Sequence, residues 1–336
     1  MKPIIPSTLL AALLAVGAAH AAATDPVGYV SLGDTTAGQP AIKPNTDVAV
    51  AIPLDKPAAF AGTVASVAGN VITISGTPAL GSFTATPNIA KLESGAKTGL
   101  NGLITANTAN TVTITVPTGD SLTGVIAGDA ISLRPAWTVV GTFGTTLPAG
   151  TQILGFSGNT PGINLASDLV YEFDGSNWVD AIFGDTVDNN VFYTGESFVI
   201  RNNAATPIAS LVVSGEVPTT NSRVIVSRFA GAPNGQDNRV AYVSPVNETI
   251  GDSHLGAIST PGDQILAFNN NAAGINKSSS TIVEWDGADW VDAIFGDTVT
   301  NTFNLVGGQG YVLRRAAAAP VGDTIWADQP SYVGSL

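Results

Sequence analysis

The sequence contains no cysteine, and only two of its 336 residues are histidines. Without thiols there is no disulfide framework, no cysteine nucleophile and no thiolate metal ligand. Only one histidine, His254, lies beyond the first 21 residues, so metal sites built on several imidazoles are excluded by count. A Ser-His-Asp triad would have to use this ring, and no Gly-x-Ser-x-Gly motif is present. We therefore expect a protein that is not an enzyme.

Basic residues and long apolar runs are also scarce. Lys and Arg number 13 against 26 Asp and Glu, which gives a formal net charge of −13. So acidic a surface argues against nucleic acid or anionic lipid as a partner. Glycine-rich phosphate-binding motifs are missing too. After residue 21 no segment approaches the ~20 apolar residues of a membrane-spanning helix, and we expect no membrane span.

The first residues have the features of a secretory signal peptide. Lys2 supplies the positive charge, residues 9–16 form a short apolar run, and Ala19-His20-Ala21 fits a cleavage site. We predict that residues 1–21 are removed and that the protein is secreted, extracellular or at the cell surface, with the periplasm as an alternative. Since 44% of the residues are hydrophobic, the mature chain is expected to fold around its own cores.

An internal duplication organises the mature chain. The ten residues from Trp178 to Val187 return unchanged from Trp290 to Val299. When the comparison is extended back to Thr151 and Asp263, 22 of 37 aligned positions are identical. The offset of 112 residues is longer than the roughly 20–50 residues of a solenoid repeat, so each copy should be a module with its own core.

Short alternating strands separated by turns of Gly, Pro, Asn and Asp predict an all-β protein. Five or six of these strands, between residues 60 and 135, are enough for a small closed barrel of the OB-like or SH3-like kind. We predict two homologous β-sandwich or barrel modules, with this barrel inserted in the first. The expected boundaries are 22–59 with 136–218 for the first module, 60–135 for the barrel and 219–336 for the second module.

The segment at residues 27–32 is a candidate for self-assembly. It lies at the start of the mature chain and could add to the exposed sheet edge of a neighbouring molecule. The residues that would do so are Val27, Tyr29, Val30 and Leu32. The alternative is pairing within its own module, as the similar segment at 240–244 is expected to pair.

Each module has two aromatic residues facing each other across a four-residue turn. The pairs are Phe173 with Trp178 and Trp285 with Trp290. A cross-strand aromatic pair stabilises a hairpin by up to ~1 kcal/mol. If partly exposed, the same pair could stack on a sugar ring, which makes polysaccharide binding an alternative function.

Acidic residues cluster in the same turns. The candidate oxygen ligands are Asp174, Asp180 and Asp185, with Asp286, Asp292 and Asp297 in the second copy. They could bind Ca²⁺, although no EF-hand-type loop is present. The alternative is that they are solvated turn formers. No cofactor other than calcium is indicated.

Several short motifs together resemble a family of uncharacterised exported proteins of verrucomicrobial bacteria. They are Asp25–Val30, Phe60–Val64, Ser94–Gly99 ahead of Ile104–Asn107, and Gly162–Asn164 with its copy Gly274–Ser278. The resemblance implies export and a repeated β architecture, and it implies no activity.

The sequence thus predicts a non-catalytic structural or interaction protein of the cell surface, a matrix or a fibre. Its expected partners are copies of itself or other surface components.

Overall fold

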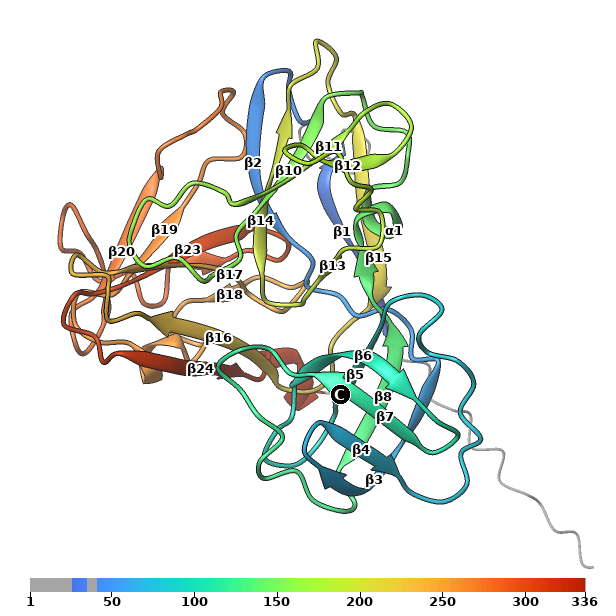
Figure 1. Cartoon of the computed structure of the whole chain (residues 1–336). Helices are drawn as coiled ribbons and strands as arrows, with labels where there is room; N and C mark the ends of the chain where they lie inside the picture. The colour runs from blue at the N-terminus through green and yellow to red at the C-terminus, as the bar shows by residue number, and fades with distance from the viewer. Residues whose placement is uncertain (1–25, 35–40, 336) are drawn as a thin grey trace, which may run out of the picture.

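A computed structural model of the protein describes residues 26–34 and 41–335 (Figure 1). The predicted signal peptide lies outside the described residues. The regular secondary structure of the described chain is almost all β-strand, as predicted, and the chain folds into a closed barrel and two modules built of small sheets. No helix among these residues is long and apolar enough to cross a membrane.

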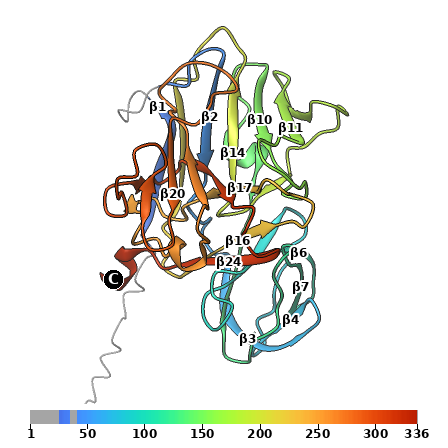
Figure 2. The ribbon, with the colours of Figure 1, turned by 90° about the vertical axis from the view of Figure 1, so that its left-hand side faces the viewer.

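The barrel closes in the strand order β3-β4-β7-β6-β5-β8, and Figure 2 shows its ring of strands below the two modules. Its strands are β3 (Phe60–Ala68), β4 (Val71–Ile74), β5 (Asn88–Leu92), β6 (Asn101–Asn107), β7 (Thr111–Thr115) and β8 (Ala130–Pro135). In β4, in β7 and in the first four residues of β6 every second residue is buried, so apolar residues fill the interior while threonines face outward. Closure leaves no free sheet edge.

The first module has a five-stranded sheet of order β12-β11-β10-β14-β2 and two strand pairs, β1-β15 and β13-β9. Its elements are β1 (Val27–Asp34), β2 (Thr46–Ala51), β9 (Trp137–Thr138), α1 (Val139–Phe143), β10 (Thr151–Gly155), β11 (Leu169–Phe173), β12 (Trp178–Asp180), β13 (Val191–Phe192), β14 (Ser197–Asn202) and β15 (Ser210–Glu216).

The second module repeats this plan with a sheet of order β17-β23-β19-β20-β21 and the pairs β16-β24 and β18-β22. Its elements are β16 (Ser222–Arg228), β17 (Gln236–Ala241), β18 (Glu248–Thr249), η1 (Leu255–Ile258), β19 (Gln264–Ala267), β20 (Thr281–Trp285), β21 (Trp290–Asp292), β22 (Asn304–Leu305), β23 (Gly310–Arg315) and β24 (Gly322–Asp328), followed by η2 (Ser331–Ser335).

The N-terminal strand is used inside its own module. β1 pairs antiparallel with β15 from Val27 to Asp34, and β16 pairs with β24 in the same way. β16 is therefore the counterpart of β1. Val240 and Ala241 of the similar segment pair within their own module, as expected, but they do so as the end of β17 against β23. Val27 and Tyr29 are exposed, whereas Val30 and Leu32 pack in the first core. Addition of this strand to a neighbouring chain stays a prediction.

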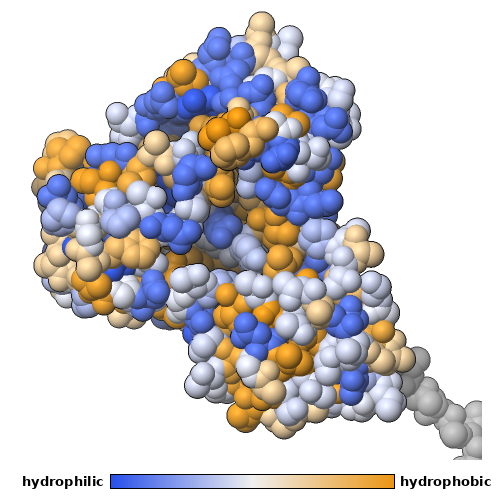
Figure 3. All heavy atoms as spheres, in the orientation of Figure 1, coloured by the Kyte–Doolittle hydropathy of each residue, from blue (hydrophilic) through white to orange (hydrophobic). Residues whose placement is uncertain are grey.

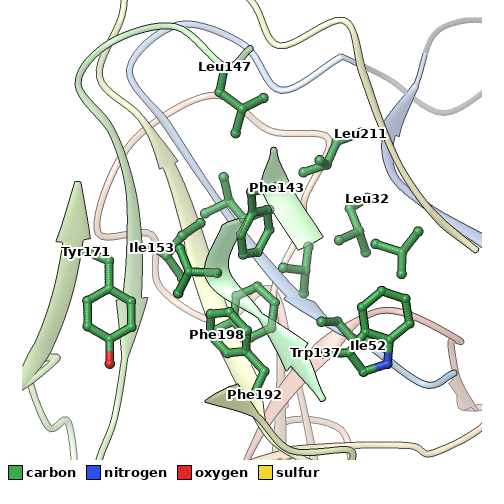
Figure 4. Packing of buried hydrophobic residues seen from close by; sticks show 14 of the residues in the cluster. Leu32, Ile52, Trp137, Phe143, Leu147, Ile153, Tyr171, Phe192, Phe198 and Leu211 are labelled. Atoms are coloured by element: carbon green, nitrogen blue, oxygen red, sulfur yellow. The ribbon is translucent and has the colours of Figure 1, made fainter. Parts of the chain in front are cut away.

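One segment rich in β-branched residues is partly helical. The β-branched run at 137–140 is typical of a strand, but β9 ends at Thr138 and α1 begins at Val139. The Thr138 hydroxyl accepts a hydrogen bond from the Gly141 amide at 3.1 Å, which is a normal helix N-cap. The helix places Phe143 against Phe192 and Phe198 in the first core (Figure 4).

Candidate functional site

The aromatic pairs belong to the cores. Trp178 and Trp290 are 0% and 1% exposed, Phe173 is buried, and Trp285 is partly buried. The ring centroids lie 5.4 Å apart in the Phe173–Trp178 pair and 5.5 Å apart in the Trp285–Trp290 pair. Neither buried tryptophan offers a face to a sugar ring in this conformation. We therefore do not base a carbohydrate function on these residues.

The candidate calcium ligands mostly bind backbone amides of their own turns. Asp174 Oδ1 accepts hydrogen bonds from Ser176 N at 2.7 Å and Asn177 N at 2.8 Å, and Asp286 does the same in the second copy. These two hydrogen bonds hold the pKa of Asp174 below its usual value. No group of three or more His, Cys, Asp or Glu residues in the described chain is placed to hold a metal ion. The turns give the calcium hypothesis no geometric support.

The repeated Asp-Ala-Ile-Phe-Gly-Asp segments form two identical loops, at 180–185 and 292–297, which we call the finger loops. In the first, Asp180 Oδ1 accepts hydrogen bonds from the amides of Ile182 at 2.8 Å and Phe183 at 2.9 Å. The Gly184 amide donates to the Asp180 carbonyl at 2.8 Å, with a φ of 78° that glycine adopts easily. Asp185, another predicted calcium ligand, accepts from the Asp180 amide through its carbonyl.

The second finger loop repeats this geometry. Asp292 Oδ1 accepts from Ile294 and Phe295 at the same 2.8 and 2.9 Å, and the carbonyl of Asp297 accepts from the Asp292 amide. Both loops hold their apolar tips in water: Ile182 and Phe183 are 67% and 78% exposed, and Ile294 and Phe295 are 77% and 78% exposed. A large exposed apolar group is unusual enough to suggest a contact surface.

The two modules hold each other through exchanged loops, an arrangement that we call the reciprocal clasp. In the second module, the loop between β19 and β20 contains Asn276, whose amide N donates to Asp47 Oδ2 on β2 at 2.7 Å. Arg201 donates hydrogen bonds to both Asp47 and Asn276. In the first module, the loop between β10 and β11 contains Asn164, whose amide N donates to Asp237 on β17 at 2.7 Å. Arg314 donates hydrogen bonds to both Asn164 and Asp237.

The reciprocal clasp has the pattern of a two-fold interface. The backbone repeats it, because Asp47 N donates to Gly274 O and Asp237 N to Gly162 O, each at 2.9 Å. Such mutual contacts between equivalent residues are those of a symmetric dimer interface, here formed within one chain.

A cleft opens where the barrel and the two modules meet, and Figure 3 shows this hollow at the centre of the molecule. Glu196 and Tyr193 lie on its wall. Water still reaches Glu196, but the surrounding cleft removes enough solvent to raise its pKa to about 7. A carboxyl group with this pKa can transfer protons. Asp168, Asp237 and Asp323 also line the cleft, and each of these carboxylates already accepts hydrogen bonds from neighbouring residues, so we place no reaction there.

His254, the one histidine among the described residues, does not complete a triad with its neighbouring serine. His254 Nδ1 lies 2.9 Å from Asp328 Oδ1. The adjacent Ser253 is fully buried and donates its hydroxyl to the Ile250 carbonyl at 2.8 Å, so it is not available as a nucleophile.

The buried Asp328 predicts a pH dependence of stability. Burial raises its pKa from 3.8 to about 6, with nearby Glu248 adding to the rise and His254 opposing it, and its Oδ2 has no hydrogen-bond partner among the described residues. Between about pH 4 and 6 the folded state keeps a proton that the unfolded state has released, so stability should fall as pH rises through this range. We expect a loss of about 3 kcal/mol, since one pKa unit is about 1.4 kcal/mol and the rise is about two units.

Urea unfolding at several pH values measures this effect. The Asp328→Asn variant should be less pH-dependent over the same range, because the amide does not titrate. An unchanged slope in the variant would contradict the assignment to Asp328.

Comparisons with known proteins add no family to this picture: no protein-family model, no curated protein and no solved structure matches the chain. The candidate sites therefore depend on the geometry of this chain. The sequence analysis proposed Asp180 and Asp292 as metal ligands and overlooked the Ile-Phe tip that follows each of them. The signal was present, because these loops fall within the ten identical residues although a surface loop normally varies more than the core.

Proposed function

We propose that this chain is an exported, non-catalytic interaction protein that binds through its two finger loops and assembles with further copies of itself into a surface, matrix or fibre structure. One observation carries the proposal. The longest identical stretch of the duplication has exposed Ile-Phe tips at its centre, and these side chains are not part of either core cluster. Identity at exposed positions is what two loops need if both contact the same kind of surface.

The placement of the finger loops supports a bridging role. Each loop follows an edge strand of its five-stranded sheet, β12 in the first module and β21 in the second. The opposite edge strands, β2 and β17, carry Asp47 and Asp237 and contact the other module. A chain with two such contacts can join two neighbours, and repeated joining that does not close into a ring gives an open assembly. The backbone hydrogen bonds preorganise each tip, which reduces the entropy lost on binding.

The test is the size of the mature chain, residues 22–336, measured by light scattering after size exclusion over a range of concentrations. We expect assemblies larger than a monomer for the wild type, smaller ones for Phe183→Ser or Phe295→Ser alone, and a monomer for the double variant. Because these phenylalanines are exposed, the changes should alter stability by less than about 0.5 kcal/mol.

Val321→Ser is the matched control, because it replaces an exposed apolar residue (63%) outside the finger loops. Its assembly should equal that of the wild type. A wild type that stays monomeric, or a double variant that assembles normally, would rule out self-association through the finger loops.

A further inference from the structure

A second site lies at the inner side of the modules, away from the finger loops. It is a cavity of about 340 Å³ beside the reciprocal clasp, within the size range of roughly 300–1,000 Å³ that small-ligand sites have. We call it the axial pocket. Both modules line it, chiefly with Leu154, Phe156, Arg201, Arg239, Phe268 and Lys277.

The axial pocket carries positive charge that the protein does not neutralise. Asp47 is its one lining carboxylate, and this group is bound by Arg201 through two hydrogen bonds of 2.7 and 2.8 Å. Lys277 donates only to the backbone carbonyls of Asn269 and Ala272. Three cations and one carboxylate leave a formal charge of +2, in a chain whose net charge is −13.

Arg239 is the lining cation with the most unused hydrogen-bond donors. Its guanidinium packs 4.0 Å from the ring centroid of Phe156 and makes no hydrogen bond to any described residue. The carboxylate that acts on it, Asp237, is already bound by Arg314. Partial burial lowers the pKa of both Arg239 and Lys277, and the charges of Asp237 and Asp47 offset this lowering only in part.

The two modules differ at this pocket in a consistent way. The offset that relates Gln152 to Gln264 also relates Phe156 to Phe268 (112 residues), and both rings line the cavity. The same offset relates Leu165 to Lys277. β2 and β17 are equivalent strands of the two modules, since Asp47 and Asp237 make the same contacts in the clasp, and in this alignment Ala49 corresponds to Arg239. Thus both unneutralised cations come from the second module, at positions where the first has apolar side chains.

We propose that the axial pocket binds a small organic anion, a carboxylate carried on a flat apolar body. Arg239 presents the planar fork of donors that matches a carboxylate, and its stacking on Phe156 fixes the plane. Lys277 adds a point charge on the same module. The apolar body would lie against Phe268, Leu154 and the other apolar lining residues. This inference is independent of the finger loops.

Calorimetry on residues 22–336 with 2-naphthoate tests the proposal, using 2-naphthalenemethanol and 2-naphthylmethylammonium as neutral and cationic analogues. We expect naphthoate to bind at least tenfold more tightly than either analogue and more weakly as salt increases, because the attraction is between charges. Arg239→Ala and Lys277→Leu give the second module the residues of the first. Arg239→Ala should weaken naphthoate binding about tenfold or more, as the loss of a hydrogen bond between charged groups does.

Lys43→Leu is the matched control, because Lys43 is an exposed neighbouring cation that does not line the pocket. It should leave naphthoate affinity nearly unchanged, and thermal melting should confirm that each variant is folded. The proposal is overturned if naphthoate does not bind the wild type below about 1 mM. It is equally overturned if the neutral analogue binds as tightly, or if Arg239→Ala with Lys277→Leu binds like the wild type.

Discussion

Replacing Asp55 by alanine is expected to destabilise the protein by about 3 kcal/mol, because it removes the closest counter-charge of a buried lysine. Asp55 follows β2 in the first module, and its Oδ2 lies 2.6 Å from Nζ of Lys91 in the barrel. The side chains are 7% and 6% exposed. Glu93 remains 3.6 Å from Lys91, so the loss should be at the lower end of the range for a broken buried pair.

The same ion pair joins the barrel to the module that carries it. Arg134 on β8 extends the network to Glu93 at 2.7 Å and to Glu216 on β15 at 3.1 Å. Urea unfolding followed by tryptophan fluorescence would measure the loss in Asp55→Ala. Asp185→Ala, which removes an exposed carboxylate, is the control and should change stability by less than about 0.5 kcal/mol. Equal stability of Asp55→Ala and wild type would show that the network contributes little.

Trp178→Ala and Trp290→Ala should each cost about 3–5 kcal/mol, the usual range for deleting a large buried aromatic side chain. Trp178 packs against Phe143 and Phe173 and donates its indole N–H to the Gly144 carbonyl at 2.8 Å. Trp290 packs against Trp285 in the second core. The two changes should therefore destabilise different modules.

Calorimetric melting measures both effects. Phe183→Ala is the control, because it removes an exposed aromatic residue from the same hairpin as Trp178 and should leave the melting temperature nearly unchanged. If Trp178→Ala melted like the wild type, and iodide quenched Trp178 in the intact protein, the ring would be a surface residue and sugar stacking would regain its basis.

The parts of the fold that could be predicted were those encoded locally. Alternating apolar residues and Gly, Asn and Asp turns define β4, β7 and their neighbours without reference to the rest of the chain. The turn at 174–177 was recognisable because an aspartate at its first position accepts amide hydrogen bonds from the residues that follow. Such signals fixed the all-β class and the closed barrel.

The parts that could not be predicted depend on distant residues. Nothing near Asp47 in the sequence indicates that it bonds Asn276, 229 residues away. The equivalence of β16 and β1 was missed because the two strands pair in the same way but differ in sequence. The cations of the axial pocket were visible as differences between the repeats, but only the clasp shows that Arg239 and Lys277 meet at one cavity.

The reciprocal clasp makes this chain a dimer whose two halves share one backbone. In a dimer of identical chains, every residue beside the symmetry axis occurs twice, so a site there must present the same groups from both sides. Joining the halves in one polypeptide removes this restriction, since Ala49 and Arg239 can differ while the contacts that hold the halves together stay equal. An asymmetric ligand can then bind beside the axis, while the finger loops at the two outer edges keep identical tips for identical neighbours.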